Sequence, residues 1–191
     1  MNAMQKTSYS QFIRRGFSLV EILVVITIIA VLAAIAYPVA GKMIKSSKLK
    51  KNLAMIVTIE RGIEDFYDDY GYFPIDAGSD DEIELDQVNL LNALAGNTKD
   101  RNTTGKNFVA SLPDASNGVS GLVYLANGDI DSLVNSFGGD FYIMLDGTFD
   151  EEIDEPNEFG NTTIKQKRSL IWTYGEEGQD GDENDFVTSW E

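Results

Sequence analysis

The chain of 191 residues contains neither cysteine nor histidine. Without cysteine, no disulfide can brace a domain that lies outside the cytoplasm. Without histidine, Ser-His-Asp catalysis, Cys-His catalysis and every histidine-based metal site are excluded. Basic residues are also scarce in most of the chain: from residue 52 onward there are 30 acidic and seven basic residues, a net charge of −23. Such a surface repels nucleic acid, and we expect no nucleic-acid partner.

One long apolar run extends from Phe17 to Ala36, and its twenty residues include only three polar ones, Ser18, Glu21 and Thr27. Twenty residues of α-helix reach about 30 Å, which is the hydrocarbon thickness of a bilayer. Arg14 and Arg15 precede the run and the acidic region follows it. The positive-inside rule therefore predicts a single-pass helix with a cytoplasmic N-terminus and the remainder outside.

Glu21 is unexpected in such a helix, because a carboxylate at the bilayer centre costs about 2.5–3.5 kcal/mol. The residues from Arg14 to Glu21, RRGFSLVE, resemble the processing site of type IV pilins and type II secretion pseudopilins. The resemblance implies that a prepilin peptidase cuts between Gly16 and Phe17 and methylates the new N-terminal amine of Phe17. It also implies that Glu21, the fifth residue of the mature chain, pairs with the N-terminal amine of a neighbouring subunit during assembly. Two opposite charges in lipid offset each other's desolvation.

Two plainer interpretations of the apolar run stay open. In the first, the run is an ordinary single-pass anchor and Glu21 lies near the membrane interface. In the second, it is a secretory signal peptide with Ala34-Ile35-Ala36 as the cleavage site. The run is longer than the ~7–15 residues usual for a signal peptide, and the helical pattern continues past that site.

The helical pattern continues well beyond the apolar run. Pro38 predicts a kink or local melting between Ala36 and Lys42. Apolar residues then recur at three- and four-residue spacing on one face: Leu49, Leu53, Ile56, Ile59, Ile63, Phe66 and Tyr70. Gly71 predicts the end of the helix. The predicted parts are a leader (1–16), an apolar assembly helix (17–37), the amphipathic half of the same helix (38–70) and an extracytoplasmic head (71–191).

The predicted fold class is α+β, a long N-terminal helix packed on a small antiparallel β-sheet. Residues 88–94 predict a short helix that ends at Gly96. Residues 141–145 alternate as a strand does, with residues 169–174 as the partner strand and Asp146-Gly147 as a hairpin turn signal. Residues 59–74 and 135–147 also resemble, more loosely, two segments of major pseudopilins, and this resemblance implies the same pilin-like fold.

A basic collar follows the apolar run, formed by Lys42, Lys45, Lys48, Lys50 and Lys51. One interpretation is that the collar anchors the chain to anionic lipid headgroups. The other is that it faces the acidic heads of neighbouring subunits, in which case assembly would be sensitive to salt.

The loop formed by residues 174–186 resembles the calcium-binding loop of major pseudopilins. Calcium takes six to eight oxygen ligands on a flexible frame, and the loop is rich in glycine and acidic residues. The resemblance implies a ligand set of the Glu177 and Asp185 side chains, the Tyr174 and Phe186 carbonyls, and a further oxygen from Asp182 or Glu183. The loop is not an EF-hand, because Asp185 stands where that motif needs glycine.

The alternative for this loop is a mobile acidic tail. The charge cluster is followed by apolar residues, Phe186, Val187 and Trp190. They favour a tail that packs back on the head. Carboxylates held close together then need a counter-ion. A bound Ca²⁺ would thus hold together a head that has no disulfide.

The resemblance as a whole implies a structural subunit and not an enzyme, closest to the major pseudopilin of type II secretion. Such a subunit starts in the cytoplasmic (inner) membrane and joins a periplasmic homopolymer with the help of minor pseudopilins and an inner-membrane assembly platform. Two alternatives stay open: a type IV pilin for adhesion, motility or DNA uptake, and a membrane-anchored calcium-dependent binding module. A glycosidase built on Asp68 and Asp69 is disfavoured, because no cleft is evident around them.

Overall fold

The structure is a computed structural model of the chain, and it describes residues 16–77, 87–160, 162–181 and 185–190. The chain divides into two compact units, Met1–Met43 and Ile44–Glu191. Of the predicted leader, residues 1–15 lie outside the described residues.

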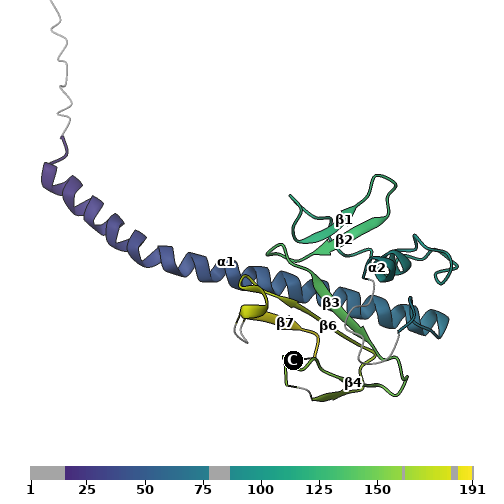
Figure 1. The fold of residues 1–191 in the computed structure, drawn as a ribbon. Coiled ribbons are helices and arrows are strands. Elements are labelled where there is room, and N and C mark those ends of the chain that lie inside the picture. The colour runs from purple at the N-terminus through teal and green to yellow at the C-terminus, as the bar shows by residue number, and fades with distance from the viewer. Residues whose placement is uncertain (1–15, 78–86, 161, 182–184, 191) are drawn as a thin grey trace, which may run out of the picture. The chain divides into compact units, whose positions relative to one another are not determined.

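Helix α1 extends from Leu19 to Tyr70, 52 residues in all, and confirms the predicted long helix (Figure 1). It ends where the sequence indicates: Gly71 has φ of +75°, and its N–H donates to the carbonyl of Tyr67 at 2.7 Å. Glycine adopts this left-handed conformation at low cost. The helix is unbroken through residues 36–42, so the predicted alternative of local melting is wrong there. Proline removes only one backbone hydrogen bond, and a kink at Pro38 stays a prediction.

In the first unit, α1 is apolar and exposed on all sides. An 18-residue window has a mean hydropathy of 3.0, and none of it is buried against the rest of the described chain. By length and composition, this part of the helix is able to cross a membrane. A helix that is apolar all round has to be covered by lipid or by other helices.

In the second unit, one face of α1 is buried in the core of the head. The residues of this face are at most 2% exposed: Asn52, Met55, Ile56, Ile59, Ile63 and Phe66. The predicted apolar face is correct for most of its length, but Leu53 is 42% exposed. The reason is that the buried stripe passes through a polar residue, Asn52, whose Oδ1 accepts the N–H of Ser136 at 2.8 Å.

A three-stranded antiparallel sheet packs against this face of α1 and confirms the α+β class. Its strands, in the order β3-β6-β7, are β3 (Phe141–Leu145), β6 (Ser169–Tyr174) and β7 (Phe186–Thr188). The predicted pairing of β3 with β6 is confirmed, with Phe141 opposite Thr173 and Leu145 opposite Ser169. Side chains from β3 and β6 share one apolar core with those of α1.

The predicted hairpin turn at Asp146-Gly147 is wrong. A second hairpin, β4 (Glu152–Asp154) and β5 (Thr163–Lys165), lies in the chain between β3 and β6. Asp146 is 1% exposed, and its carboxylate accepts the N–H of Phe149 at 2.7 Å and that of Glu151 at 2.8 Å. An aspartate that favours a tight turn can also organise a longer loop, because both uses satisfy backbone donors.

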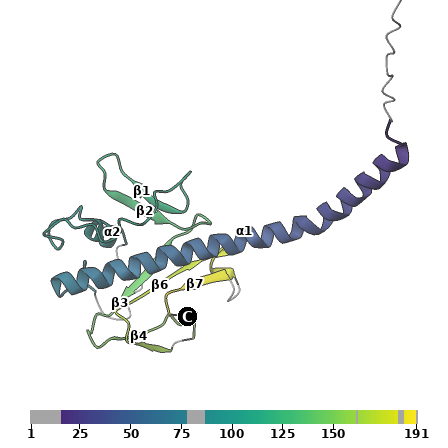
Figure 2. The ribbon, with the colours of Figure 1, turned by 180° about the vertical axis from the view of Figure 1, so that it is seen from behind.

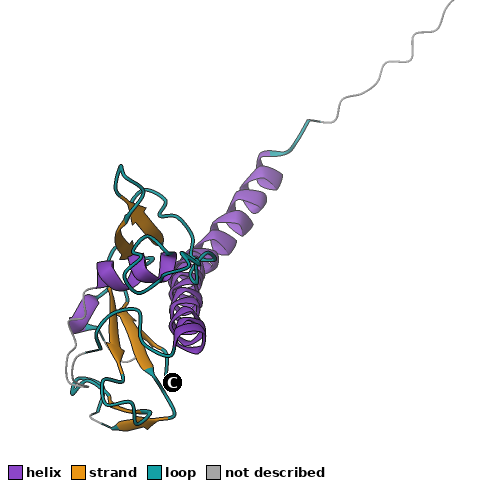
Figure 3. Cartoon of the chain, turned by 90° about the vertical axis from the view of Figure 1, so that its right-hand side faces the viewer, coloured by secondary structure: helices purple, strands orange, loops and turns teal. Residues whose placement is uncertain are grey.

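Helix α2 (Gln87–Ala95) and the hairpin of β1 (Gly121–Tyr124) and β2 (Ile130–Val134) complete the head. They lie on one side of the C-terminal part of α1, and β4 lies on the other (Figures 1 and 2). In the side view of Figure 3, the β1–β2 hairpin lies at the top of the head, α2 lies below it, and the other strands lie beneath α2. The predicted end of the short helix is confirmed, since Gly96 follows α2 with φ of +84°.

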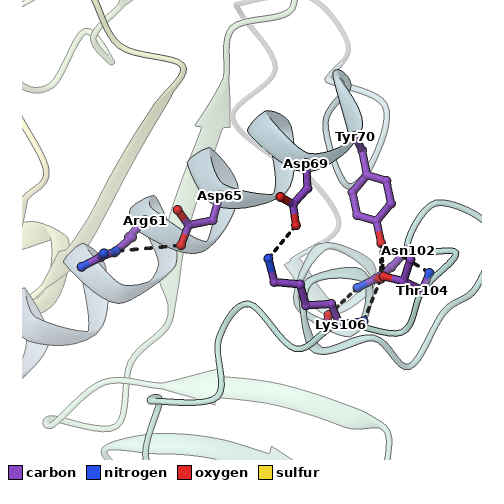
Figure 4. Close-up of polar contacts among 7 residues, drawn as sticks. All are labelled: Arg61, Asp65, Asp69, Tyr70, Asn102, Thr104 and Lys106. Atoms are coloured by element: carbon purple, nitrogen blue, oxygen red, sulfur yellow. Dashed lines mark hydrogen bonds and ion pairs between the residues drawn. The ribbon is translucent and has the colours of Figure 1, made fainter.

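The C-terminal end of α1 is tied to the loop of residues 102–106 (Figure 4). Lys106 Nζ lies 2.5 Å from Asp69 Oδ2, and the Tyr70 hydroxyl donates to Asn102 Oδ1 at 2.9 Å. The ion pair is exposed and contributes little by itself. The hydrogen bond of Tyr70 is more shielded, because Asn102 is fully buried, and it fixes the loop against the helix.

Candidate functional site

Most of the predicted functional residues lie in two places: the N-terminal end of α1 with the residues just before it, and the loop between β6 and β7. In the first, Gly16, Phe17 and Ser18 lie outside the helix. Phe17 is 82% exposed, and apart from the neighbouring residues of the chain no atom lies within 4 Å of where a Cβ of Gly16 would be. Within the described part of the chain, the Gly16–Phe17 peptide bond is therefore open to a peptidase.

Glu21 has a partner in its own chain. Its Oε2 accepts the backbone N–H of Ser18 at 2.8 Å, while Ser18 Oγ accepts the N–H of Val20 at 3.3 Å. Serine followed three residues later by glutamate is the pattern of a capping box, which satisfies backbone donors at the start of a helix. The carboxylate also lies at the positive end of the helix dipole. The spacing of Ser18 and Glu21 in the sequence already indicates this local role.

The loop between β6 and β7 brings together only part of the predicted calcium ligands. Tyr174 and Phe186 are directly opposite each other in the β6–β7 register, and Asp185 precedes Phe186. Glu177 precedes the short 3₁₀ helix η1 (Gly178–Asp180), and its side chain is exposed. Asp182 and Glu183 lie outside the described residues.

Asp185 is the one deeply buried acid of this loop among the described residues, at 1% exposure. Its Oδ2 accepts the N–H of Glu177 at 2.7 Å, and Lys45 Nζ lies 2.7 Å from its Oδ1. The second contact lacks hydrogen-bond geometry and is an ion pair, since Oδ1 has no hydrogen-bond partner. Burial raises the pKa of Asp185, but Lys45 and the Glu177 N–H outweigh it and leave the pKa below its usual value.

The glycines of this loop make room for the Asp185 carboxylate. A Cβ on Gly175 would lie 2.4 Å from Asp185 Oδ1, and one on Gly181 would lie 2.9 Å from Oδ2. Real Cβ atoms essentially never come this close to another atom. In a calcium loop such glycines let the backbone bend, whereas here the backbone at Gly175 and Gly181 closes directly around a carboxylate.

The described residues do not make a calcium site. Calcium needs six to eight oxygens at about 2.3–2.6 Å, and the described part of the chain has no group of three or more acidic residues that could hold a metal. The carbonyl of Tyr174 accepts a hydrogen bond from Asn135 Nδ2 at 2.9 Å, and the Asp185 carboxylate is already paired with Lys45. Calcium binding stays a prediction, and it depends on Asp182 and Glu183.

Lys45 contacts this loop although the sequence pattern assigns it to the basic collar. A signal for it exists in the helical pattern. Lys45 precedes Asn52 by seven residues, as Asn52 precedes Ile59, so all three lie on the core-facing side of α1. Lys48 also turns toward the head, with Nζ 4.7 Å from the centre of the Phe137 ring.

The residues after the loop are packed on the head, as predicted. Trp190 Nε1 donates to Glu155 Oε2 at 3.0 Å, and the rings of Phe186 and Trp190 both contact Phe159. Tyr174 belongs to the same cluster. Burial, together with the hydrogen bond that its hydroxyl donates to Glu158, raises the pKa of Tyr174 to about 12. The mobile-tail alternative is therefore wrong for residues 185–190.

Comparison with known proteins identifies the N-terminal segment. Residues 13–37 match the family model of the prokaryotic N-terminal methylation motif. This match is consistent with a type IV pilin-like protein, either a pilin or a pseudopilin. No curated protein and no solved structure matches the chain. The methylation motif covers the segment before α1 and the apolar part of the helix, and it ends before the head.

Proposed function

We propose that this chain is a structural subunit of the major pseudopilin kind. A prepilin peptidase would process it, and it would then polymerise into a periplasmic filament that drives type II protein secretion. The observation that carries the proposal is the methylation motif at residues 13–37, which includes Gly16, Phe17 and Glu21. The fold supports it, because a long helix with an apolar N-terminal part leads into a compact α+β head.

The exposed apolar part of α1 has two successive environments in this proposal. Lipid covers it in the inner membrane, and the same part of neighbouring copies covers it in the filament. Each copy then contacts the next through two different surfaces, so growth is open-ended. Minor pseudopilins and the membrane assembly platform are the further partners that this role requires.

Cleavage provides the charge that Glu21 needs during assembly. Removal of residues 1–16 leaves a free amine on Phe17, and this amine is the cation we assign to the Glu21 carboxylate of a neighbouring copy. The carboxylate accepts one bond from Ser18 in its own chain. It has about four acceptor positions, so the bond within the chain leaves room for the amine.

The proposal is tested by intact mass after expression with a prepilin peptidase. We expect the wild-type chain to lose residues 1–16 and to gain one methyl group on Phe17. Gly16→Val should stay uncut, because the added side chain occupies the cleavage position. Gly41→Val is the matched control: Gly41 is also exposed, and outside its own stretch of helix no atom lies within 4 Å of its Cβ position. A wild-type chain that stays uncut, beside a known prepilin that is cut in the same cells, would contradict the proposal.

A deletion strain separates the pseudopilin from the surface pilin. Loss of protein secretion, with no change in surface fibres, supports the pseudopilus. Surface fibres that contain the chain and disappear with its gene would instead assign it to a type IV pilus.

A further inference from the structure

The charge balance around Asp185 points to a specific role for Lys45. Asp185 is 1% exposed, and a carboxylate buried this deeply needs an opposite charge next to it. The Lys45 ammonium lies 2.7 Å from Oδ1, and the N–H of Glu177 donates to Oδ2 at 2.7 Å. The ammonium thus forms an ion pair with one oxygen of the carboxylate, and the amide donates a hydrogen bond to the other.

The helical repeat of α1 places Lys45 on the side of the helix that faces this loop. It lies seven residues before the fully buried Asn52, and residues seven apart share a helix face. The Lys45 side chain is 35% exposed, which is low for a surface lysine. Lys45, the loop and Asp185 all belong to the second unit, so the pair lies within one folded body.

The described residues around the carboxylate leave little room for a further ligand. The Cβ positions of Gly175 and Gly181 fall within 3 Å of the Asp185 side chain, so the backbone itself encloses it on the loop side. The ammonium lies against Oδ1. A calcium ion bound to the same carboxylate would be close to this ammonium, and the two positive charges would repel each other.

We propose that Lys45 supplies the cation that neutralises Asp185, in place of a divalent metal ion, and so fastens the loop between β6 and β7 to α1. The head then keeps its fold and its C-terminal strand without calcium. This role concerns the head alone and does not depend on the proposed filament function.

The test is thermal unfolding of the full chain in detergent micelles, with calcium chloride and with a chelator. We expect the wild type to melt at the same temperature in both. Lys45→Met should melt several degrees lower, and calcium should recover part of this loss because Asp185 then lacks a counter-charge. Lys45→Arg keeps the charge and should melt like the wild type in both solutions.

The matched control is Lys50→Met, which removes an exposed lysine from the same helix and should leave the melting temperature unchanged. A wild-type melting temperature that falls on chelation would overturn the proposal, and so would equal melting temperatures for Lys45→Met and Lys50→Met. If Lys45→Met does not fold, the wild type and Lys45→Arg still test the proposal, because neither melting temperature should fall when the chelator is added.

Discussion

Replacement of Asn135 by alanine should be among the most damaging polar substitutions in the head. Asn135 is 1% exposed and lies just after β2. Its Nδ2 donates to Thr173 Oγ1 at 2.8 Å and to the carbonyl of Tyr174 at 2.9 Å. Its Oδ1 accepts the N–H of Phe137 at 2.7 Å and that of Gly139 at 3.0 Å. One side chain thus joins the turn after β2 to the end of β6.

The expected loss follows from the groups that alanine would leave without a partner. The hydrogen bond to the carbonyl of Tyr174 is buried, and leaving that carbonyl unsatisfied costs about 2 kcal/mol. Phe137 is half-buried and Gly139 is exposed, so water can reach their N–H groups and each costs about 1 kcal/mol. The total of about 4 kcal/mol is a large part of the stability of a typical domain, about 5–15 kcal/mol. At about 2–4 °C per kcal/mol, the melting temperature should fall by about 8–16 °C.

The assay is tryptophan fluorescence during thermal or urea unfolding of the full chain in detergent. The two tryptophans, Trp172 and Trp190, both lie in the head, so the membrane part of α1 does not contribute to the signal. Asn127→Ala is the matched control. Asn127 also makes side-chain hydrogen bonds, to Asp129, but it lies at an exposed hairpin tip, and its loss should stay within about 0.5 kcal/mol. Equal losses for the two variants would refute the assignment of Asn135 as a buried junction.

Glu21→Leu should abolish filament growth, seen by electron microscopy, while Thr27→Leu in the same apolar helix should not; growth of both would contradict the role of the acid. Tyr174→Phe should reduce the loss of stability at alkaline pH. The raised pKa of Tyr174 stabilises the fold below pH 10.0, and this stabilisation is lost as the pH rises toward about 12. Identical melting temperatures of wild type and variant across this pH range would contradict the prediction. Gly175→Ala should lower the melting temperature by several degrees, because its Cβ would lie 2.4 Å from Asp185 Oδ1, and an unchanged value would exclude this close approach.

The sequence predicts the long helix and its C-terminal end because both depend on local signals. Apolar spacing identifies the core-facing side around Ile59, and Gly71 ends the helix by its own conformational freedom. The pairing of β3 with β6 is also accessible, since each strand is a short apolar run. The extra hairpin between them cannot be predicted in this way. Asp146 gives the same turn signal whether it lies in a two-residue hairpin turn or accepts hydrogen bonds within a longer loop.

The N-terminal end of α1, with the residues just before it, is the other part that sequence alone identifies. Its motif is a continuous string, so Gly16, Phe17 and Glu21 are found without knowledge of the fold. The hydrogen bond from the Ser18 N–H to the Glu21 carboxylate is also local and is predictable from the capping-box spacing. The C-terminal loop is different, because the partner of Asp185 is 140 residues away in the chain.

A loop with glycines and carboxylates therefore specifies less than its resemblance to a calcium site implies. What Gly175, Gly181 and Asp185 encode together is a backbone that closes around one buried negative charge. That charge needs a cation, but the loop does not determine which cation it is. The cation is determined by the residue of α1 that lies against the loop, and here that residue is Lys45. The same loop opposite an apolar residue at position 45 would leave Asp185 without a counter-charge, and only then would a metal ion be needed.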